Sequence, residues 1–138
     1  MESYKKWDPL QTMPGLAGKY RIDVIHDSSE YFSVSLLDIQ NQDHKIKLIW
    51  KDSLSISRKV DFSQNSRYLN NLKRTVAPEL IDNWSFFKVE NSKFLAWLSI
   101  QSDNWSDYMS FEHYHILGPD SLLDIVANYE PIIELKDC

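Results

Sequence analysis

His113 and His115 are the residues of this chain whose types and spacing come closest to a chemical site. They lie in residues 111–117, a segment that we predict to be a β-strand. Because side chains at i and i+2 of a strand point to the same face, the two imidazoles can share a metal ion, as His-x-His pairs do in zinc sites. The remaining ligands would have to come from His26, His44, Glu112 or Asp124.

The sequence nevertheless predicts no bound metal and no cofactor. The spacing of the additional candidates matches no ligand signature, and a histidine pair on a strand is more often part of a partly buried polar face. His113 and His115 remain the candidate ligands if a metal does bind.

Asp124 is the one acidic residue that interrupts the apolar run 122–127. We expect it to face solvent on an edge strand. The alternative is a pocket in which the pKa of its carboxyl is raised. In that case His113, His115 and Asp124 would be the polar groups of a pocket for a small molecule or a hydrolysable substrate.

Two familiar kinds of site are absent from the sequence. No Gly-x-Ser-x-Gly elbow is present, which removes the usual signature of a serine hydrolase. With only three glycines in the chain, a glycine-rich phosphate-binding loop is also excluded.

Residues 102–110 form a polar segment with two large aromatic side chains, which we predict to be a loop. Aromatic residues of this kind are often partly buried, so we favour a loop whose aromatics pack back onto the core. The alternative is a binding loop, because exposed aromatics are enriched at interfaces. Its candidate binding residues are Asp103, Trp105, Asp107 and Tyr108.

Composition and charge narrow the classes of partner. The chain of 138 residues is the usual size of one domain, and its 15 basic and 20 acidic residues give a net charge of −5. This balance argues against nucleic acid as the main partner and suits a basic protein. The single cysteine, Cys138, cannot form an internal disulfide.

No stretch of the sequence resembles a signal peptide or a membrane span. We therefore expect a cytoplasmic protein with no membrane association.

The pattern of the chain predicts the α+β class. Residues 1–19 are expected to be an irregular N-terminal arm, and residues 20–138 a single domain. That domain is mainly an antiparallel sheet of about seven or eight strands, with two helices packed on one face. The strands are expected at residues 20–26, 32–36, 46–50, 54–62, 84–89, 111–117, 122–127 and 132–135.

The first four strands should form one antiparallel meander and the last three another. One helix should follow the possible caps at residues 63–66 and end before Pro78, and the other should begin after Asn91 or Ser92. Residues 122–127 are too short a run for periodicity to separate strand from helix, although Ile125 and Val126 favour a strand.

The tryptophans are expected to be mostly core residues. By periodicity we assign Trp50, Trp84 and Trp97 to the interior. Phe94, Trp97, Leu98 and Gln101 fall at helical spacing, so their helix should place an apolar stripe on the sheet.

The segments 84–98, 111–116 and 123–131 together resemble the C-terminal half of many small uncharacterised bacterial proteins. Several of those proteins look like immunity proteins of toxin–immunity systems. The resemblance implies a small cytoplasmic α+β protein that binds and blocks a toxin domain, and it transfers no functional residue.

Two functions therefore follow from the sequence. The first is a non-enzymatic, immunity-like module that binds and neutralises a toxin domain, most suitably a basic one. The second is a small-molecule-binding protein or hydrolase with its pocket near His113, His115 and Asp124. Both a monomer and a dimer are compatible with the sequence.

Overall fold

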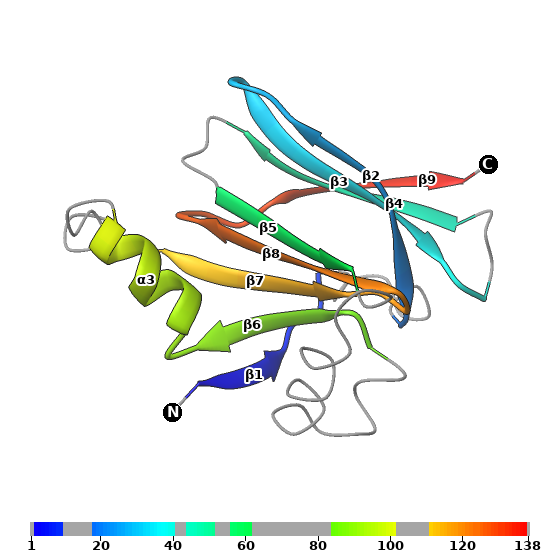
Figure 1. Ribbon diagram of the computed structural model, residues 1–138. Helices are drawn as coiled ribbons and strands as arrows, with labels where there is room; N and C mark the ends of the chain where they lie inside the picture. Colours follow the sequence, from blue (N-terminus) through cyan, green and yellow to red (C-terminus); the bar gives the residue numbers. More distant parts are fainter. Residues whose placement is uncertain are drawn as a thin grey trace.

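The computed structural model describes residues 2–9, 18–40, 44–51, 56–61, 84–101 and 111–137. In these residues the chain forms nine β-strands and one α-helix, arranged as two antiparallel sheets (Figure 1). The predominance of antiparallel sheet is confirmed. The helix predicted before Pro78 and the loop predicted at 102–110 lie outside the described residues.

The first sheet has five strands and carries the candidate site. Its spatial order is β1, β6, β7, β8, β5. The bounds are Ser3–Lys6 for β1, Phe86–Glu90 for β6, Glu112–Leu117 for β7, Ser121–Ala127 for β8 and Ile56–Asp61 for β5. Helix α3, Lys93–Gln101, follows β6 and lies against one end of this sheet (Figure 1).

The second sheet has four strands in the order β2, β3, β4, β9. The bounds are Tyr20–Asp27 for β2, Tyr31–Asp38 for β3, His44–Lys51 for β4 and Ile132–Asp137 for β9. Strands β2, β3 and β4 pair in sequence order, as the meander pattern predicts.

Two strands pair differently from the sequence prediction. The fourth strand of the expected N-terminal meander, β5, leaves β4 and pairs with β8 in the other sheet. The closing strand β9 leaves β8 and pairs with β4. A single sheet with two meanders is therefore wrong, because hydrophobic alternation identifies a strand and its buried face but not its neighbour.

The hairpin of β7 and β8 confirms the predicted strand at residues 122–127. Its turn spans Gly118, whose N–H donates to the Ser121 carbonyl over 2.8 Å. A Cβ atom at position 118 would lie 3.2 Å from that carbonyl oxygen and 3.6 Å from the Tyr20 oxygen. Glycine is thus favoured because a side chain at this position would crowd the Ser121 carbonyl within the turn, whereas the distance to Tyr20 of β2 is an ordinary contact.

The expected N-terminal arm contains a strand. Residues Ser3–Lys6 pair with β6, with Tyr4 opposite Val89 and Lys6 opposite Phe87. The prediction of an irregular segment is wrong for these four residues, whose pairing depends on a strand more than eighty residues later. Residues 10–17 lie outside the described residues.

The hydrophobic core lies between the two sheets. Alternate residues of β3 and β4 meet alternate residues of β6, β7 and β8 there, and Trp50 contacts Tyr114 with ring centroids 5.4 Å apart. Trp50 and Trp84 are buried, as predicted. This shared core joins the two sheets into one packed body.

Trp97 is an exception to the predicted aromatic core, because 56% of its surface is exposed. Phe94 and Leu98, at i and i+4, are the buried helix residues that pack on Val126 of the sheet, and the partly buried Leu95 packs against them. Trp97 lies beside that contact and stacks on Phe94, with ring centroids 6.4 Å apart and 13° between the planes. The apolar stripe of α3 is therefore wider than the face that the sheet buries.

Ser85 links the two sheets through its buried side chain. Its hydroxyl oxygen accepts the N–H of Tyr20 over 2.8 Å and donates to the Tyr20 carbonyl over 3.3 Å. The Ser85 carbonyl also accepts the N–H of Leu117 over 2.7 Å. The start of β2 is thereby tied to the beginning of β6 and the end of β7.

We predict that Ser85→Ala destabilises the protein. The change leaves the buried N–H and carbonyl of Tyr20 without the Ser85 hydroxyl, which should lower the free energy of unfolding by about 1–3 kcal/mol. Guanidinium denaturation measures the effect. Ser57→Ala, on edge strand β5, is the control and should change stability by less than about 0.5 kcal/mol; equal losses in the two variants would contradict the linking role of Ser85.

Candidate functional site

Strand β7 has one face in the shared core and a second, polar face. Tyr114 and Ile116 point into the core, whereas His113 and His115 lie on the opposite side of the strand. Both histidines are nevertheless buried, at 2% and 0% exposure. The second face of the sheet therefore encloses two imidazoles.

Strand register brings a carboxylate and a guanidinium to the same face. His115 is paired with Asp124 across the β7–β8 hairpin, and Asp124 is paired with Arg58 across β8 and β5. Directly paired residues of antiparallel strands share a face. Three adjacent strands thus place His115, Asp124 and Arg58 in a row, with His113 two residues from His115.

Asp124 accepts four hydrogen bonds in this row. Its Oδ1 accepts from Nε2 of His113 over 2.6 Å and from Nδ1 of His115 over 2.8 Å. Its Oδ2 accepts from Nε and Nη2 of Arg58 over 3.2 and 2.8 Å. A carboxylate with no exposed surface is therefore surrounded by donors on both oxygens, as burial of a charge requires.

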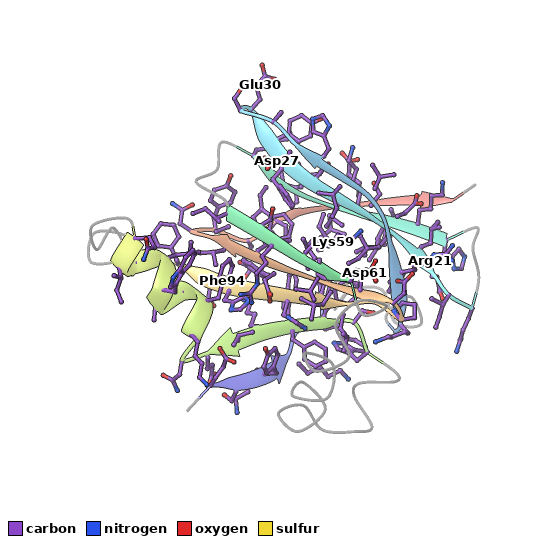
Figure 2. The ribbon with its side chains drawn as sticks, viewed as in Figure 1. Arg21, Asp27, Glu30, Lys59, Asp61 and Phe94 are labelled. Atoms are coloured by element: carbon purple, nitrogen blue, oxygen red, sulfur yellow. The ribbon has the colours of Figure 1, made fainter. Side chains whose placement is uncertain are left out.

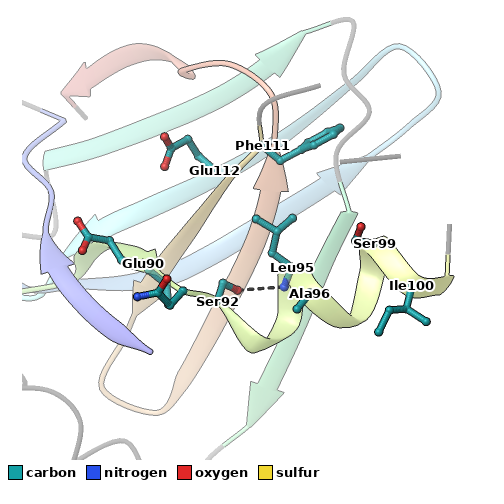
Figure 3. Close-up of a pocket in the computed structure, with 10 residues that line it drawn as sticks. Glu90, Ser92, Leu95, Ala96, Ser99, Ile100, Phe111 and Glu112 are labelled. Carbon is teal, nitrogen blue, oxygen red and sulfur yellow. Dashed lines mark hydrogen bonds between the residues drawn. The ribbon is translucent and has the colours of Figure 1, made fainter. Parts of the chain in front are cut away.

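Ser92 completes the arrangement on the outer side of His113. The Nδ1 of His113 lies 2.6 Å from Oγ of Ser92. Because Nε2 of His113 donates to Asp124, Nδ1 is the acceptor and the Ser92 hydroxyl donates to it. Ser92 Oγ also accepts the N–H of Leu95 over 3.0 Å, which makes it the N-cap of α3 (Figure 3).

The second nitrogen of His115 differs from the rest of the cluster. With Nδ1 donating to Asp124, Nε2 carries a lone pair, and this buried atom has no hydrogen-bond partner in the part of the chain that the structure describes. Its surroundings include the ring of Tyr4, whose centroid lies 4.9 Å from that of the imidazole. A buried nitrogen of this kind is uncommon and needs a physical reason.

Both sequence interpretations of Asp124 are wrong. The residue lies on β8, between β7 and β5, and it is buried rather than exposed on an edge strand. Burial by itself would raise the pKa of the Asp124 carboxyl, but hydrogen bonds from His113 and His115 outweigh burial and hold that pKa far below its usual range. The carboxyl is therefore an anion rather than a proton donor.

Ser92, His113 and Asp124 have the order of a nucleophilic triad, but their geometry favours a structural role. Ser92 is only 8% exposed, and its oxygen is occupied as the acceptor of a helix-capping bond. A nucleophile needs a free lone pair directed at the substrate. We therefore interpret Ser92 as a cap that also orients His113.

A cavity of about 450 Å³ opens beside the cluster. Its walls include Tyr4, Arg58, Phe94, Trp97 and His113. Figure 2 shows Phe94 on the side of α3 that faces the sheet, and the Arg58 guanidinium lies 4.2 Å from the centre of its ring. Glu2 and Lys93 line it as well, so the cavity combines aromatic walls, charges of both signs and the edge of the buried histidine cluster.

A second, more open groove of about 740 Å³ lies on the other side of α3 (Figure 3). Glu90 and Glu112 border this groove, and Leu95, Ile100 and Phe111 contribute apolar surface. Ile100 is 71% exposed. Helix α3 thus separates a cavity beside the histidines from an apolar groove with acidic borders.

The structure brings together three of the residues singled out in the sequence. In the described residues, His113, His115 and Asp124 are the one group of three or more potential metal ligands, with ligand atoms within 4.8 Å of one another. His26 instead stacks on Tyr31 at an exposed site. The candidate binding residues Asp103, Trp105, Asp107 and Tyr108 lie outside the described residues.

Sequence reasoning missed Arg58 and the second role of Ser92. The sequence did hold a usable signal for the pairing of His115 with Asp124, because a tight turn after Leu117 sets the register of the β7–β8 hairpin. No local signal pointed to Arg58, whose strand comes from a distant part of the chain.

Comparisons of the chain with protein-family models, with curated proteins and with solved structures give no match. The resemblance to immunity proteins therefore stays a prediction. No helix in the described part of the chain has the length and apolar character needed to cross a membrane.

We predict that Asp124→Asn lowers the free energy of unfolding by about 3 kcal/mol at pH 7, since it leaves a buried network of donors without its anion. The loss should shrink in acid. Below a pH of about 4 Asp124 becomes protonated in the unfolded chain but stays ionised in the folded one. The wild type therefore loses free energy of unfolding as the pH falls, whereas the variant, which has no carboxyl at this position, does not lose that contribution.

Denaturation curves at pH 7 and pH 3 measure this difference. Asp120→Asn, in the exposed turn of the same hairpin, is the matched control and should behave as the wild type at both pH values. An Asp124→Asn effect that is the same at pH 7 and pH 3 would contradict the lowered pKa.

Proposed function

We propose that this protein is a non-enzymatic binding module of the immunity type, which blocks a basic toxin domain through the exposed face of α3 and the adjoining acidic groove. The observation that carries the proposal is the pair of large apolar side chains that α3 leaves in solvent. Trp97 and Ile100 are 56% and 71% exposed. Tryptophan is among the residues most enriched at the energetic centres of interfaces.

The shape of the surface supports a protein partner. Trp97 contributes to the cavity on one side of α3, and Ile100 to the groove on the other. A partner that contacts the helix between them would fill hollows on both sides, and such fully enclosed aromatic anchors contribute most of the affinity of an interface.

Charge favours a basic partner over a neutral one. Glu90 and Glu112 are exposed on the border of the groove, and the whole chain carries a net charge of −5. Complementary charge speeds association and disfavours wrong partners. A basic toxin domain would supply lysine and arginine side chains for these two carboxylates.

We extend the proposed interface to the candidate binding loop on the order of the sequence alone. Residues 102–110 follow Gln101, the last residue of α3, directly in the chain. We therefore assign Asp103, Trp105, Asp107 and Tyr108 to the same interface, where they would add two acidic and two aromatic groups.

We predict that Trp97→Ala combined with Ile100→Ala abolishes protection. The test co-expresses the chain with the toxin domain of a large secreted protein encoded beside its gene. The wild type should restore growth and bind the purified toxin domain, whereas the double variant should weaken binding at least tenfold, as loss of an interface hot spot does.

The control for this experiment is Val24→Ala combined with Ile132→Ala. These residues are also exposed, at 55% and 48%, but they lie on the other sheet. The control should protect as the wild type does. Protection that survives loss of Trp97 and Ile100 would remove α3 from the interface.

We predict a separate effect of the loop. Trp105→Ala combined with Asp107→Ala should slow association and weaken binding to the same toxin domain, with a stronger effect at low salt because an attractive charge is lost. Stopped-flow association at two salt concentrations measures this. Unchanged association and affinity would clear residues 102–110 of a binding role.

One observation favours small-molecule binding as a second candidate function. The cavity of about 450 Å³ beside His113 is within the size range of ligand sites, and aromatic walls with one or two polar groups are typical of them. Tyr4, Phe94 and Trp97 supply such walls, and Arg58 supplies a cation. Glu2 and Lys93 also line the cavity, so its aromatic walls are bordered by charges of both signs.

A further inference from the structure

We propose that His113, His115 and Asp124 form a binding site for one transition-metal ion, with Zn²⁺ the favoured ion. The ligand atoms are Nε2 of His113, Nδ1 of His115 and Oδ1 of Asp124, which lie within 4.8 Å of one another. This inference is independent of the protein-binding proposal, because it concerns a buried cluster rather than the surface of α3.

The three ligand atoms already lie close together, and binding of an ion requires their side chains to rearrange around it. Zinc ligands at about 2.0–2.1 Å from the ion stand roughly 3.3 Å from each other in a tetrahedral site. The two histidine nitrogens now lie 2.6 and 2.8 Å from Oδ1 of Asp124. Each nitrogen must move about half an ångström away from Oδ1, and the two nitrogens, which stand within 4.8 Å of each other, must approach to about 3.3 Å.

The donor set selects the class of metal. Two imidazoles and one carboxylate suit zinc and other late first-row ions, whereas magnesium and calcium prefer oxygen ligands alone. Two histidines and one carboxylate also leave coordination positions for solvent or another ligand. His113 lines the cavity of about 450 Å³, which gives the ion a route to the cluster.

Two of the three ligand side chains, His113 and Asp124, already have supporting hydrogen bonds. Ser92 reaches the outer nitrogen of His113, and Arg58 holds Oδ2 of Asp124 while leaving Oδ1 for the metal. Such outer hydrogen bonds fix the orientation of metal ligands. The positive charge of Arg58 would repel the metal ion. The Arg58 side chain is 41% exposed, so water screens part of that repulsion.

Metal binding would change the tautomer of both histidines. The nitrogens that now donate to Asp124 must give up their protons to bind the ion, and in each ring the proton moves to the other nitrogen. For His113 the new N–H would donate to Ser92 Oγ, whose own proton rotates away. For His115 the new N–H would lie on Nε2, the buried atom without a partner in the described residues.

The experiment uses the full chain, stripped of metal with a chelator and titrated with ZnCl₂. We expect one ion per chain by calorimetry, a rise in melting temperature with zinc concentration, and Co²⁺ absorption bands typical of nitrogen and oxygen ligands. His113→Gln and His115→Gln should each weaken binding at least tenfold. His26→Gln, at an exposed histidine, is the matched control and should bind as the wild type does.

If a variant does not fold, nitrogen-detected NMR of the wild type still identifies which histidines bind the ion. Zinc should shift the ring nitrogens of His113 and His115 and leave those of His26 unchanged. The proposal would be overturned by any one of three results. These are absence of stoichiometric binding, wild-type affinity in the His113→Gln or His115→Gln variant, and ring nitrogens of His113 and His115 that zinc leaves unchanged in the wild type.

Discussion

A carboxylate without contact to water needs hydrogen-bond donors around both of its oxygens, and Asp124 obtains them from three strands. His113 and His115 on β7 donate hydrogen bonds to Oδ1, and Arg58 on β5 donates to Oδ2. Each donor is correctly placed only if β8 lies between β7 and β5 in the observed register. Because an unpaired buried charge is so costly, this requirement disfavours every other register of the five-stranded sheet.

The same network connects the sheet to the helix that carries the proposed binding surface. Ser92 hydrogen-bonds His113 on one side and caps α3 on the other, so the first turn of the helix is fixed to the polar face of the sheet. Phe94 and Leu98 then pack on Val126. Trp97 and Ile100 remain in solvent on a helix whose position is held by buried groups, which keeps an exposed apolar pair in a constant geometry.

Local patterns in the sequence predicted most strands but not their pairing. Alternation identified β2, β3 and β4, the β-branched residues Ile125 and Val126 favoured β8, and the turn at Gly118 predicted the hairpin of β7 and β8. Nothing local placed β1 beside β6 or Arg58 beside Asp124, since those contacts join segments more than sixty residues apart. Trp97 was misassigned for a related reason: helical spacing shows which residues share a face but not how far the sheet extends beneath it.

The exchange of β5 and β9 between the sheets has a consequence for synthesis of the chain. Strand β5 pairs with β8, and β4 pairs with β9, so each sheet needs strands from both the early and the late part of the sequence. When β5 leaves the ribosome, its neighbour has not yet been made. The five-stranded sheet cannot reach its native set of strands until β8, residues 121–127, emerges, and the four-stranded sheet must wait for β9, residues 132–137. Folding of this domain is therefore completed only after β9 has been translated.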